Sequence, residues 1–209
     1  MKISIIGTGN MGRAIATRAV AGGHEVQVVD RDPDHAQALA TDLGGGVTAA
    51  RLGDTLTGDV VVLALYYEPA LEVVGRHGGD LAGKIVVDIT NPVDTATFDG
   101  MLPPDGSSGA QEIQERLPES RVVKAFNTTF AGPLTAGEVA GQPLDVLVAA
   151  DDADAKATVV SFVESTGLRP LDAGSLKRSR ELEALGFLQM AMQGALGNTW
   201  ATTFKVLGA

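Results

Sequence analysis

Short apolar segments alternate along the chain with longer segments of helical composition. The β-branched runs at residues 2–6 and 25–29 each precede a helix-like stretch, at residues 10–21 and 34–43. The same order predicts strands at 60–65, 85–88 and 121–125, with helices at 68–76 and 110–117. We count 60–65 as the fourth strand and 121–125 as the sixth, with a third strand to which the pattern gives no range. Strands that alternate with helices form a parallel sheet covered on both faces. We therefore predict an α/β fold, a Rossmann-type doubly wound parallel sheet.

The second part of the chain has a different rhythm. Residues 93–109 are rich in Asp, Thr, Pro, Gly and Ser, which predicts a loop, within an insertion over about 93–119. Beyond the sixth strand the pattern predicts, in order, a strand at 144–150, a helix at 153–165, a short strand at 168–171 and a long helix at 175–192. We expect residues 1–127 to form a dinucleotide-binding domain around a six-stranded sheet. Residues 128–209 would form a small, mainly helical lobe that completes a cofactor cleft.

The composition of the chain excludes several classes of function. The 209 residues carry 16 Lys and Arg against 26 Asp and Glu, a net charge of −10, with no cysteine. This acidity argues against a nucleic-acid partner, and the missing thiols exclude disulfides and thiolate metal sites, so we expect no metal. The first apolar run is too short for a signal peptide, and the uncharged window 184–204 carries too many Gln, Asn, Thr and Gly residues for a membrane span. We expect a soluble, cytoplasmic protein without a membrane partner.

A glycine-rich turn follows the first strand. It reads Gly7-Thr8-Gly9-Asn10-Met11-Gly12. Because it lies between a predicted strand and a predicted helix, it matches the dinucleotide-binding pattern. Gly7 would permit the tight turn, Gly9 the approach of a pyrophosphate and Gly12 close contact between helix and strand, while the free N–H groups of the helix attract the anion.

Two residues after the second strand point to different nucleotides. Asp30 stands where an acidic side chain binds the adenosine ribose of NAD and repels the 2′-phosphate of NADP. Arg31, next along the chain, could instead stack on adenine and pair with that phosphate. The sequence leaves the choice between NADP(H) and NAD(H) open.

Ligands of such a sheet bind at the carboxyl ends of its strands. The candidate residues there are Leu65, Tyr66, Tyr67, Pro69, Asn91, Asn127, Thr128 and Thr129. No histidine is among them, and only Tyr66, Tyr67 and Lys124 could donate the proton that reduction of an imine or ketone requires. We expect Lys124 to end its strand paired with a carboxylate. When the hydride acceptor is itself a redox cofactor, the protein needs only to position the two rings correctly. These candidate residues therefore favour hydride transfer between two cofactors, with no certain catalytic residue.

Several stretches together resemble the NADP-dependent reductases of the deazaflavin coenzyme F420. They are residues 2–12, 67–70, 122–128, 168–176 and 204–208, which span essentially the whole chain. The same stretches are similar to the cytoplasmic oxidoreductase domain of membrane metalloreductases, which passes hydride from NADPH to a flavin. The Lys-Ala-Phe-Asn-Thr and Leu-Arg-Pro-Leu-Asp-Ala-Gly segments are the more specific ones.

The resemblance implies a second cofactor, F420 or a flavin, in the cleft between the domain and the lobe, and often a homodimer. Carried over by motif, Thr8, Asn10 and Met11 would line the pyrophosphate and Tyr67 and Pro69 would border the nicotinamide. Asn127 and Thr128 would approach the reacting rings, and Leu207 would close the cleft. One departure is Asp30-Arg31, where the family usually has Ser-Arg.

Two other functions fit parts of the sequence. The opening also resembles pyrroline-carboxylate reductases and hydroxyacid dehydrogenases, which act on small molecules but need a longer all-helical domain that this chain lacks. A dinucleotide-binding sensor or subunit without catalysis is the non-enzymatic alternative. Activity on an imine or hydroxy acid without a flavin would favour the first, and tight nucleotide binding without turnover the second.

Overall fold

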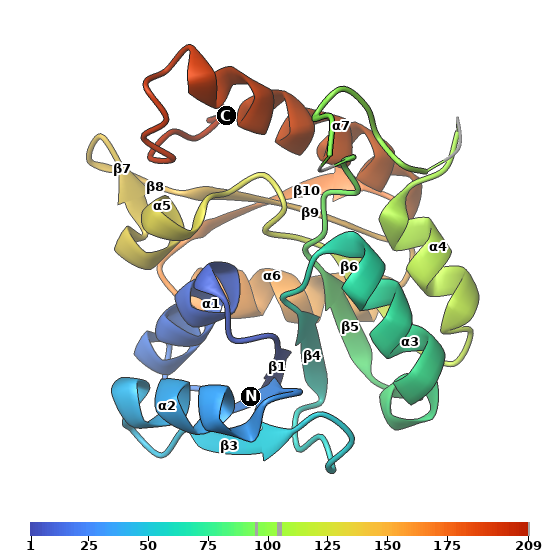
Figure 1. Cartoon of the computed structure of the whole chain (residues 1–209). Helices are drawn as coiled ribbons and strands as arrows, with labels where there is room; N and C mark the ends of the chain where they lie inside the picture. The colour runs from blue at the N-terminus through green and yellow to red at the C-terminus, as the bar shows by residue number, and fades with distance from the viewer. Residues whose placement is uncertain (95, 104–105, 209) are drawn as a thin grey trace.

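The computed structural model describes residues 1–94, 96–103 and 106–208, and its centre is one eight-stranded sheet (Figure 1). The strands run in the spatial order β10-β9-β6-β5-β4-β1-β2-β3. Their bounds are β1 Lys2–Ile6, β2 Glu25–Asp30, β3 Thr48–Arg51, β4 Val60–Leu63, β5 Ile85–Asp88, β6 Arg121–Lys124, β9 Asp145–Ala150 and β10 Arg169–Gly174. Strands β1 to β6 are parallel, whereas β9 is antiparallel to β6. The predicted α/β Rossmann-type class is confirmed.

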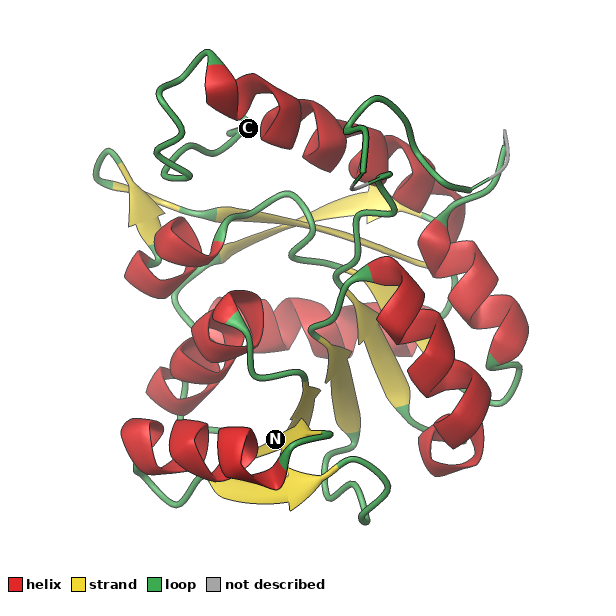
Figure 2. Ribbon diagram, in the orientation of Figure 1, coloured by secondary structure: helices red, strands yellow, loops and turns green. Residues whose placement is uncertain are grey.

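Helices cover both faces of this sheet (Figure 2). They are α1 Asn10–Ala21, α2 Pro33–Leu43, α3 Tyr67–Leu81, α4 Gly109–Arg116, α5 Ala131–Ala136, α6 Ala153–Ser165 and α7 Ser179–Ala191, with 3₁₀ turns at Leu176–Arg178 and Met192–Gly194. A small hairpin, β7 Glu138–Val139 and β8 Gln142–Pro143, follows α5. Helices α1, α2 and α6 share one buried cluster, and α3 and α4 share the other.

The central strands are apolar because they are buried on both faces. In β4, Val60 and Val62 point into the cluster under α1, while Val61 and Leu63 point into the cluster under α3. A continuous run of β-branched residues is typical of a strand covered on both sides. Alternate residues of the strand therefore face the two helix layers on opposite sides of the sheet.

The sheet is larger than predicted. Strands β9 and β10 join it instead of forming a separate appendage, so the six-stranded sheet expected from the sequence was two strands short. The apolar run of β9 was recognised, but no pattern within one strand says which sheet it joins. The sequence pattern did not locate strand β3, because its residues are half-buried or exposed at the edge of the sheet. The division at residues 127 and 128 stays a prediction, and residues 95, 104 and 105 of the predicted insertion lie outside the described residues.

The antiparallel strand β9 extends the sheet beyond the carboxyl ends of the parallel strands. Only the last two residues of β9 pair with β6, through Lys124 with Ala149 and Val123 with Ala150. The earlier residues of β9, starting at Asp145, therefore continue past the end of β6. Helix α7 lies over this layer (Figure 1). Among the described residues, no helix combines the length and the apolar composition needed to cross a membrane.

Candidate functional site

The glycine turn between β1 and α1 is built by two glycines and left open by the third. Gly7 has φ +106°, and a Cβ there would lie 2.4 Å from the Ala64 carbonyl oxygen. A Cβ at Gly12 would lie 1.9 Å from the Gly7 carbonyl oxygen, so only glycine lets α1 pack this closely. A Cβ at Gly9 would meet nothing within 4 Å. The turn thus needs glycine at positions 7 and 12 for its own packing and leaves free space at position 9.

The start of α1 has free N–H groups and no acidic side chain, which favours an anion there. Its N-cap, Gly9, supplies no side-chain acceptor, and its first turn contains no acidic residue. The N–H groups of Asn10, Met11 and Gly12 belong to the first turn and have no partner inside the helix. These N–H groups and the positive end of the helix dipole can hold a phosphate group.

Asp30 ends β2 beside this turn. Its Oδ2 atom accepts hydrogen bonds from the Thr8 hydroxyl at 2.6 Å and the Thr8 N–H at 3.2 Å. Its Oδ1 atom accepts one from the Asp32 N–H at 3.0 Å. Although partial burial works in the opposite direction, these donors lower the pKa of Asp30. The side chain of Arg31 is exposed at the same turn.

A buried ion network lies at the carboxyl ends of β5 and β6. The Lys124 ammonium donates to Asp88 Oδ2 at 2.7 Å, to Glu183 Oε1 at 2.8 Å and to the Thr90 carbonyl oxygen. All three charged side chains are fully buried. The prediction that Lys124 pairs with a carboxylate at a strand end is confirmed. Burial alone would lower the pKa of Lys124, but the two carboxylates outweigh burial and raise it.

Glu183 brings α7 onto this network. Its carboxylate also accepts hydrogen bonds from the Gly109 N–H at 3.0 Å and the Ala110 N–H at 3.2 Å, at the start of α4. Burial raises the pKa of Glu183, while Lys124 counteracts the shift. Sequence reasoning missed this residue, because no spacing signal connects it with a lysine 59 positions earlier in the chain.

Two asparagines join the same strand ends above the ion network. Asn91 Nδ2 donates to the Asn127 carbonyl oxygen at 2.7 Å, and Asn127 Nδ2 donates to Asn91 Oδ1 at 2.9 Å and to the Leu182 carbonyl oxygen at 2.8 Å. These acceptors fix the orientation of the Asn127 amide. Its Oδ1 atom is buried and has no hydrogen-bond partner among the described residues, so one acceptor is left unused. Phe126, just before Asn127, has φ +62°, which is uncommon for a bulky residue.

The tyrosines after β4 point to different places. Tyr66 caps α3 and is 80% exposed. Tyr67 is buried, and its hydroxyl donates to Glu112 Oε2 on α4 at 2.7 Å, which together with burial raises its pKa. Its side chain is therefore held in the packing of α3 on α4, and the nicotinamide border that the resemblance implies for Tyr67 stays a prediction. Leu65 borders the glycine turn, with Cδ2 at 3.0 Å from the Cβ position of Gly7.

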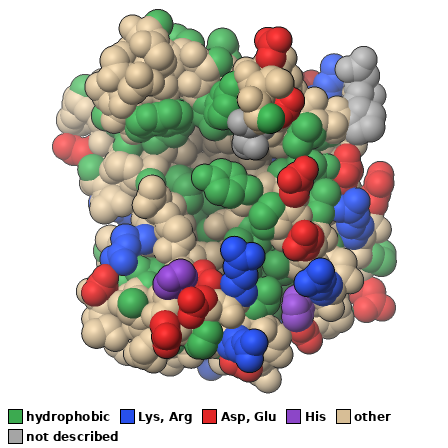
Figure 3. Space-filling model, in the orientation of Figure 1, with side chains coloured by type: hydrophobic (Ala, Val, Ile, Leu, Met, Phe, Trp, Pro, Cys, Tyr) green, Lys and Arg blue, Asp and Glu red, His purple; other side chains and the backbone are tan. Residues whose placement is uncertain are grey.

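The remaining predicted residues fall at the edges of the site. Thr128 is buried beside Asn127, and Pro69 is exposed on α3. Leu207 is 74% exposed, although the residues before it are held in place. Lys205 Nζ and the Val206 N–H both donate to Asp145, at 2.6 and 2.9 Å. Figure 3 shows a hollowed band between the part that contains α7 and the part below it, with hydrophobic side chains along it.

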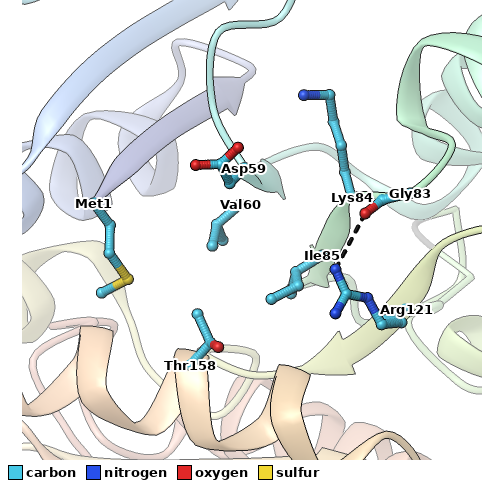
Figure 4. A pocket seen from close by; sticks show the side chains of 8 residues that line it. All are labelled: Met1, Asp59, Val60, Gly83, Lys84, Ile85, Arg121 and Thr158. Atoms are coloured by element: carbon cyan, nitrogen blue, oxygen red, sulfur yellow. Dashed lines mark hydrogen bonds between the residues drawn. The ribbon is translucent and has the colours of Figure 1, made fainter.

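A different hollow lies at the opposite end of the sheet. It has a volume of about 420 Å³ and is lined at the starts of β4 and β5 and by Arg121 and Thr158 (Figure 4). Its cations are committed to the backbone, since Arg121 donates to the Gly83 carbonyl oxygen and Lys84 to those of Leu56 and Gly58. Because ligands of parallel sheets bind at the carboxyl ends, we assign the site to the glycine turn and not to this hollow.

The chain is similar to known reductases. Residues 2–92 match the family model for NADP oxidoreductase, coenzyme F420-dependent. The F420-dependent NADP reductase of Methanocaldococcus jannaschii is 34% identical over 203 residues, covering 88% of this chain and 89% of the relative. The metalloreductase STEAP3 of Rattus norvegicus is 33% identical over 184 residues, but the chain spans only 36% of its length.

A solved structure extends this likeness to three dimensions. It comes from Arthrobacter sp. FB24 and is provisionally assigned as an F420-dependent NADP reductase. It superimposes with a TM-score of 0.87 at 32% identity and covers 99% of both chains. With the glycine turn, the strand-end residues and these relatives together, the chain belongs to the family of F420-dependent NADP oxidoreductases.

Proposed function

We propose that the protein transfers hydride between a nicotinamide dinucleotide and a deazaflavin or flavin. The family supports NADP(H) as the nucleotide of such a site. Within the family, the acceptor is the open part of the function, because the relatives include both F420-dependent reductases and metalloreductases.

One observation carries the choice of a redox cofactor as acceptor: two of the three candidate proton donors, Lys124 and Tyr67, are engaged elsewhere, and the third, Tyr66, is 80% exposed at the start of α3. Lys124 is enclosed by Asp88, Glu183 and the Thr90 carbonyl oxygen, and the Tyr67 hydroxyl is bound to Glu112. A reductase of imines or ketones has to deliver a proton together with the hydride. Hydride transfer between two ring cofactors needs only their alignment.

The histidines do not fill this role. His24 lies at the start of β2, with Nδ1 at 3.1 Å from the Met1 amino group and Nε2 at 2.7 Å from Ser165 Oγ. His77 lies on α3, 3.4 Å from Asp80. His35 is on α2, 3.9 Å from Asp32, near the end of β2 where the adenosine part of a dinucleotide would lie. None of the three belongs to the strand ends of β4, β5 and β6.

The residues of this chain would then bind and orient the two cofactors. The glycine turn and the N-terminus of α1 hold the pyrophosphate, and Asp30 holds the adenosine ribose. Asn91, Asn127 and Thr128 lie where two rings would meet, and Asn127 Oδ1 offers an acceptor to a ring N–H or carboxamide group. When bound, the nicotinamide and the deazaflavin or flavin supply the redox chemistry.

An oxidation assay tests the proposal. Purified protein is mixed with NADH or NADPH and with a deazaflavin, FMN or FAD, and the loss of the absorbance of reduced nicotinamide is followed. We expect rapid oxidation with at least one of these acceptors and none with a cyclic imine or a 2-oxo acid in their place. If no deazaflavin or flavin is reduced, the proposal is wrong. The homodimer and the cytoplasmic location remain predictions.

A further inference from the structure

We propose that this protein binds NADH more tightly than NADPH, and that Asp30 is the residue that sets this preference. The inference rests on the proposed function, since it concerns the nucleotide side of the same site. The expected preference for NADH differs from the NADP that the names of the F420-dependent relatives give. It is inferred from the geometry of the turn after β2.

The Asp30 carboxylate is tied to the turn that would hold the nucleotide. Thr8, inside the glycine turn, donates both its hydroxyl and its N–H to Oδ2, and the Asp32 N–H donates to Oδ1. A carboxylate held by three donors cannot rotate away to make room for a phosphate. An acidic side chain at this point of the fold hydrogen-bonds the ribose 2′-hydroxyl, which is the group that NADP carries as a phosphate.

Asp30 is charged whenever the protein is near neutral pH. Its hydrogen bonds hold the pKa of the carboxyl below its ordinary value despite partial burial. A 2′-phosphate beside it would bring a second negative group close to a fixed negative charge. The ribose hydroxyl of NADH instead donates to the same carboxylate.

The surroundings of Asp30 add further negative charge. Asp32 caps α2 by accepting from the Asp34 N–H at 3.0 Å, so two more carboxylates lie on the same turn. The cations near them are Arg31 and Arg51, both exposed, and the His35 ring lies beside them with Nε2 at 3.9 Å from Asp32 Oδ2. Arg51 is paired with Asp30 along β2 and β3, and its N–H donates to Asp54 at 2.8 Å.

Arg31 does not reverse this preference. Its side chain is exposed, and no hydrogen bond or ion pair to it is found among the described residues of the turn. From that position a guanidinium can stack on the adenine, a contact that NADH and NADPH offer equally, or pair with a 2′-phosphate. Pairing would require the exposed Arg31 side chain to be ordered, whereas the Asp30 carboxylate is already fixed by three hydrogen bonds, so we expect Asp30 to decide between the nucleotides.

Direct binding measurements test the inference without any acceptor. The protein is titrated with NADH and with NADPH while the fluorescence of the reduced nicotinamide is followed. We expect a Kd for NADH lower by about ten-fold or more, the size of effect that one close like-charge contact produces at a protein surface. A Kd for NADPH equal to or below that for NADH would overturn the inference. If neither nucleotide binds, the proposed function itself is wrong.

Variants locate the preference. Asp30→Asn keeps the shape of the side chain and removes its charge, and Asp30→Ser removes both, so each should shift the ratio of the two Kd values toward NADPH. Asp80→Asn is the matched control, since it removes an exposed carboxylate of α3 that lies outside this turn, and it should leave the ratio within about two-fold. Circular dichroism and Tm establish that each variant is folded. An unchanged ratio in both folded Asp30 variants would show that this residue does not face the ribose.

Discussion

The Lys124 ammonium lies 2.8 Å from the Glu183 carboxylate and joins α7 to the strand ends of the sheet. Through the same atom it reaches Asp88 at 2.7 Å and the carbonyl oxygen of Thr90, next to Asn91. Glu183 in turn caps the start of α4. One buried cation therefore holds β5, β6, α4 and α7 in a single arrangement beneath the Asn91 and Asn127 pair.

Removal of that cation should destabilise the protein strongly. Lys124→Met would leave two buried carboxylates without their cation, and the free energy of unfolding should fall by about 3–5 kcal/mol. Urea denaturation followed by circular dichroism measures the change. Arg178→Ala is the control, because it removes an exposed pair with Glu181 at 3.4 Å, and it should cost about 0–1 kcal/mol. A loss for Lys124→Met no larger than that of the control would show that the network is not closed in solution.

Gly186 on α7 should be needed for its small size. A Cβ at this position would lie 2.5 Å from Asn91 Oδ1 and 2.9 Å from the Asn127 carbonyl oxygen. Gly186→Ala should therefore lower the free energy of unfolding by about 1–3 kcal/mol, although alanine is the better helix former. The hydride-transfer rate should fall as well, since the Asn91 and Asn127 pair must shift.

A second helical glycine gives the matched comparison. A Cβ at Gly75 on α3 would meet nothing within 4 Å, so Gly75→Ala should stabilise the protein by up to about 1 kcal/mol and leave the rate unchanged. Opposite signs for the two substitutions are expected. If Gly186→Ala also stabilises the protein, the contact between α7 and the asparagines is looser than described.

The sequence predicted the parts of the site that lie close together along the chain. The glycine turn, Asp30 and the strand ends follow from periodicity and from glycine spacing, which are local signals. Glu183 and the partner of Tyr67 could not be predicted, because their contacts connect positions 59 and 45 residues apart and depend on how α7 and α4 pack. The position of β9 in the sheet could not be predicted for the same reason, since the residues of a strand do not indicate which strand pairs with it.

Acid should release the C-terminal segment from Asp145. This carboxylate accepts hydrogen bonds from Arg169, Lys205 and the Val206 N–H, which outweigh its burial and lower its pKa from 3.8 to about 2. A depressed pKa stabilises the fold above pH 3.8 and loses this contribution as the pH falls toward 2. The contribution amounts to about 2 kcal/mol.

The acid dependence is measured by urea denaturation at several pH values between about 5 and 2. The free energy of unfolding of the wild type should fall more steeply than that of Asp145→Asn, which is less stable at pH 5 but lacks the titrating group. Asp42→Asn, an exposed carboxylate paired with Arg13, should follow the wild-type curve. Parallel curves for wild type and Asp145→Asn would contradict the assignment.

The three glycines of the first turn should separate folding from binding. Gly12→Ala places a Cβ 1.9 Å from a backbone oxygen that cannot move aside, so the variant should lose about 3 kcal/mol of stability or more. Gly9→Ala places its Cβ in open space at φ −67°, which alanine adopts freely, so its Tm should match that of the wild type. The added methyl group occupies the space left for the pyrophosphate, and the Kd for the reduced nucleotide should rise by about ten-fold or more. Nucleotide fluorescence titration and thermal unfolding of the same samples distinguish the two effects, and a Gly9→Ala variant that binds as tightly as the wild type would place the nucleotide away from this turn.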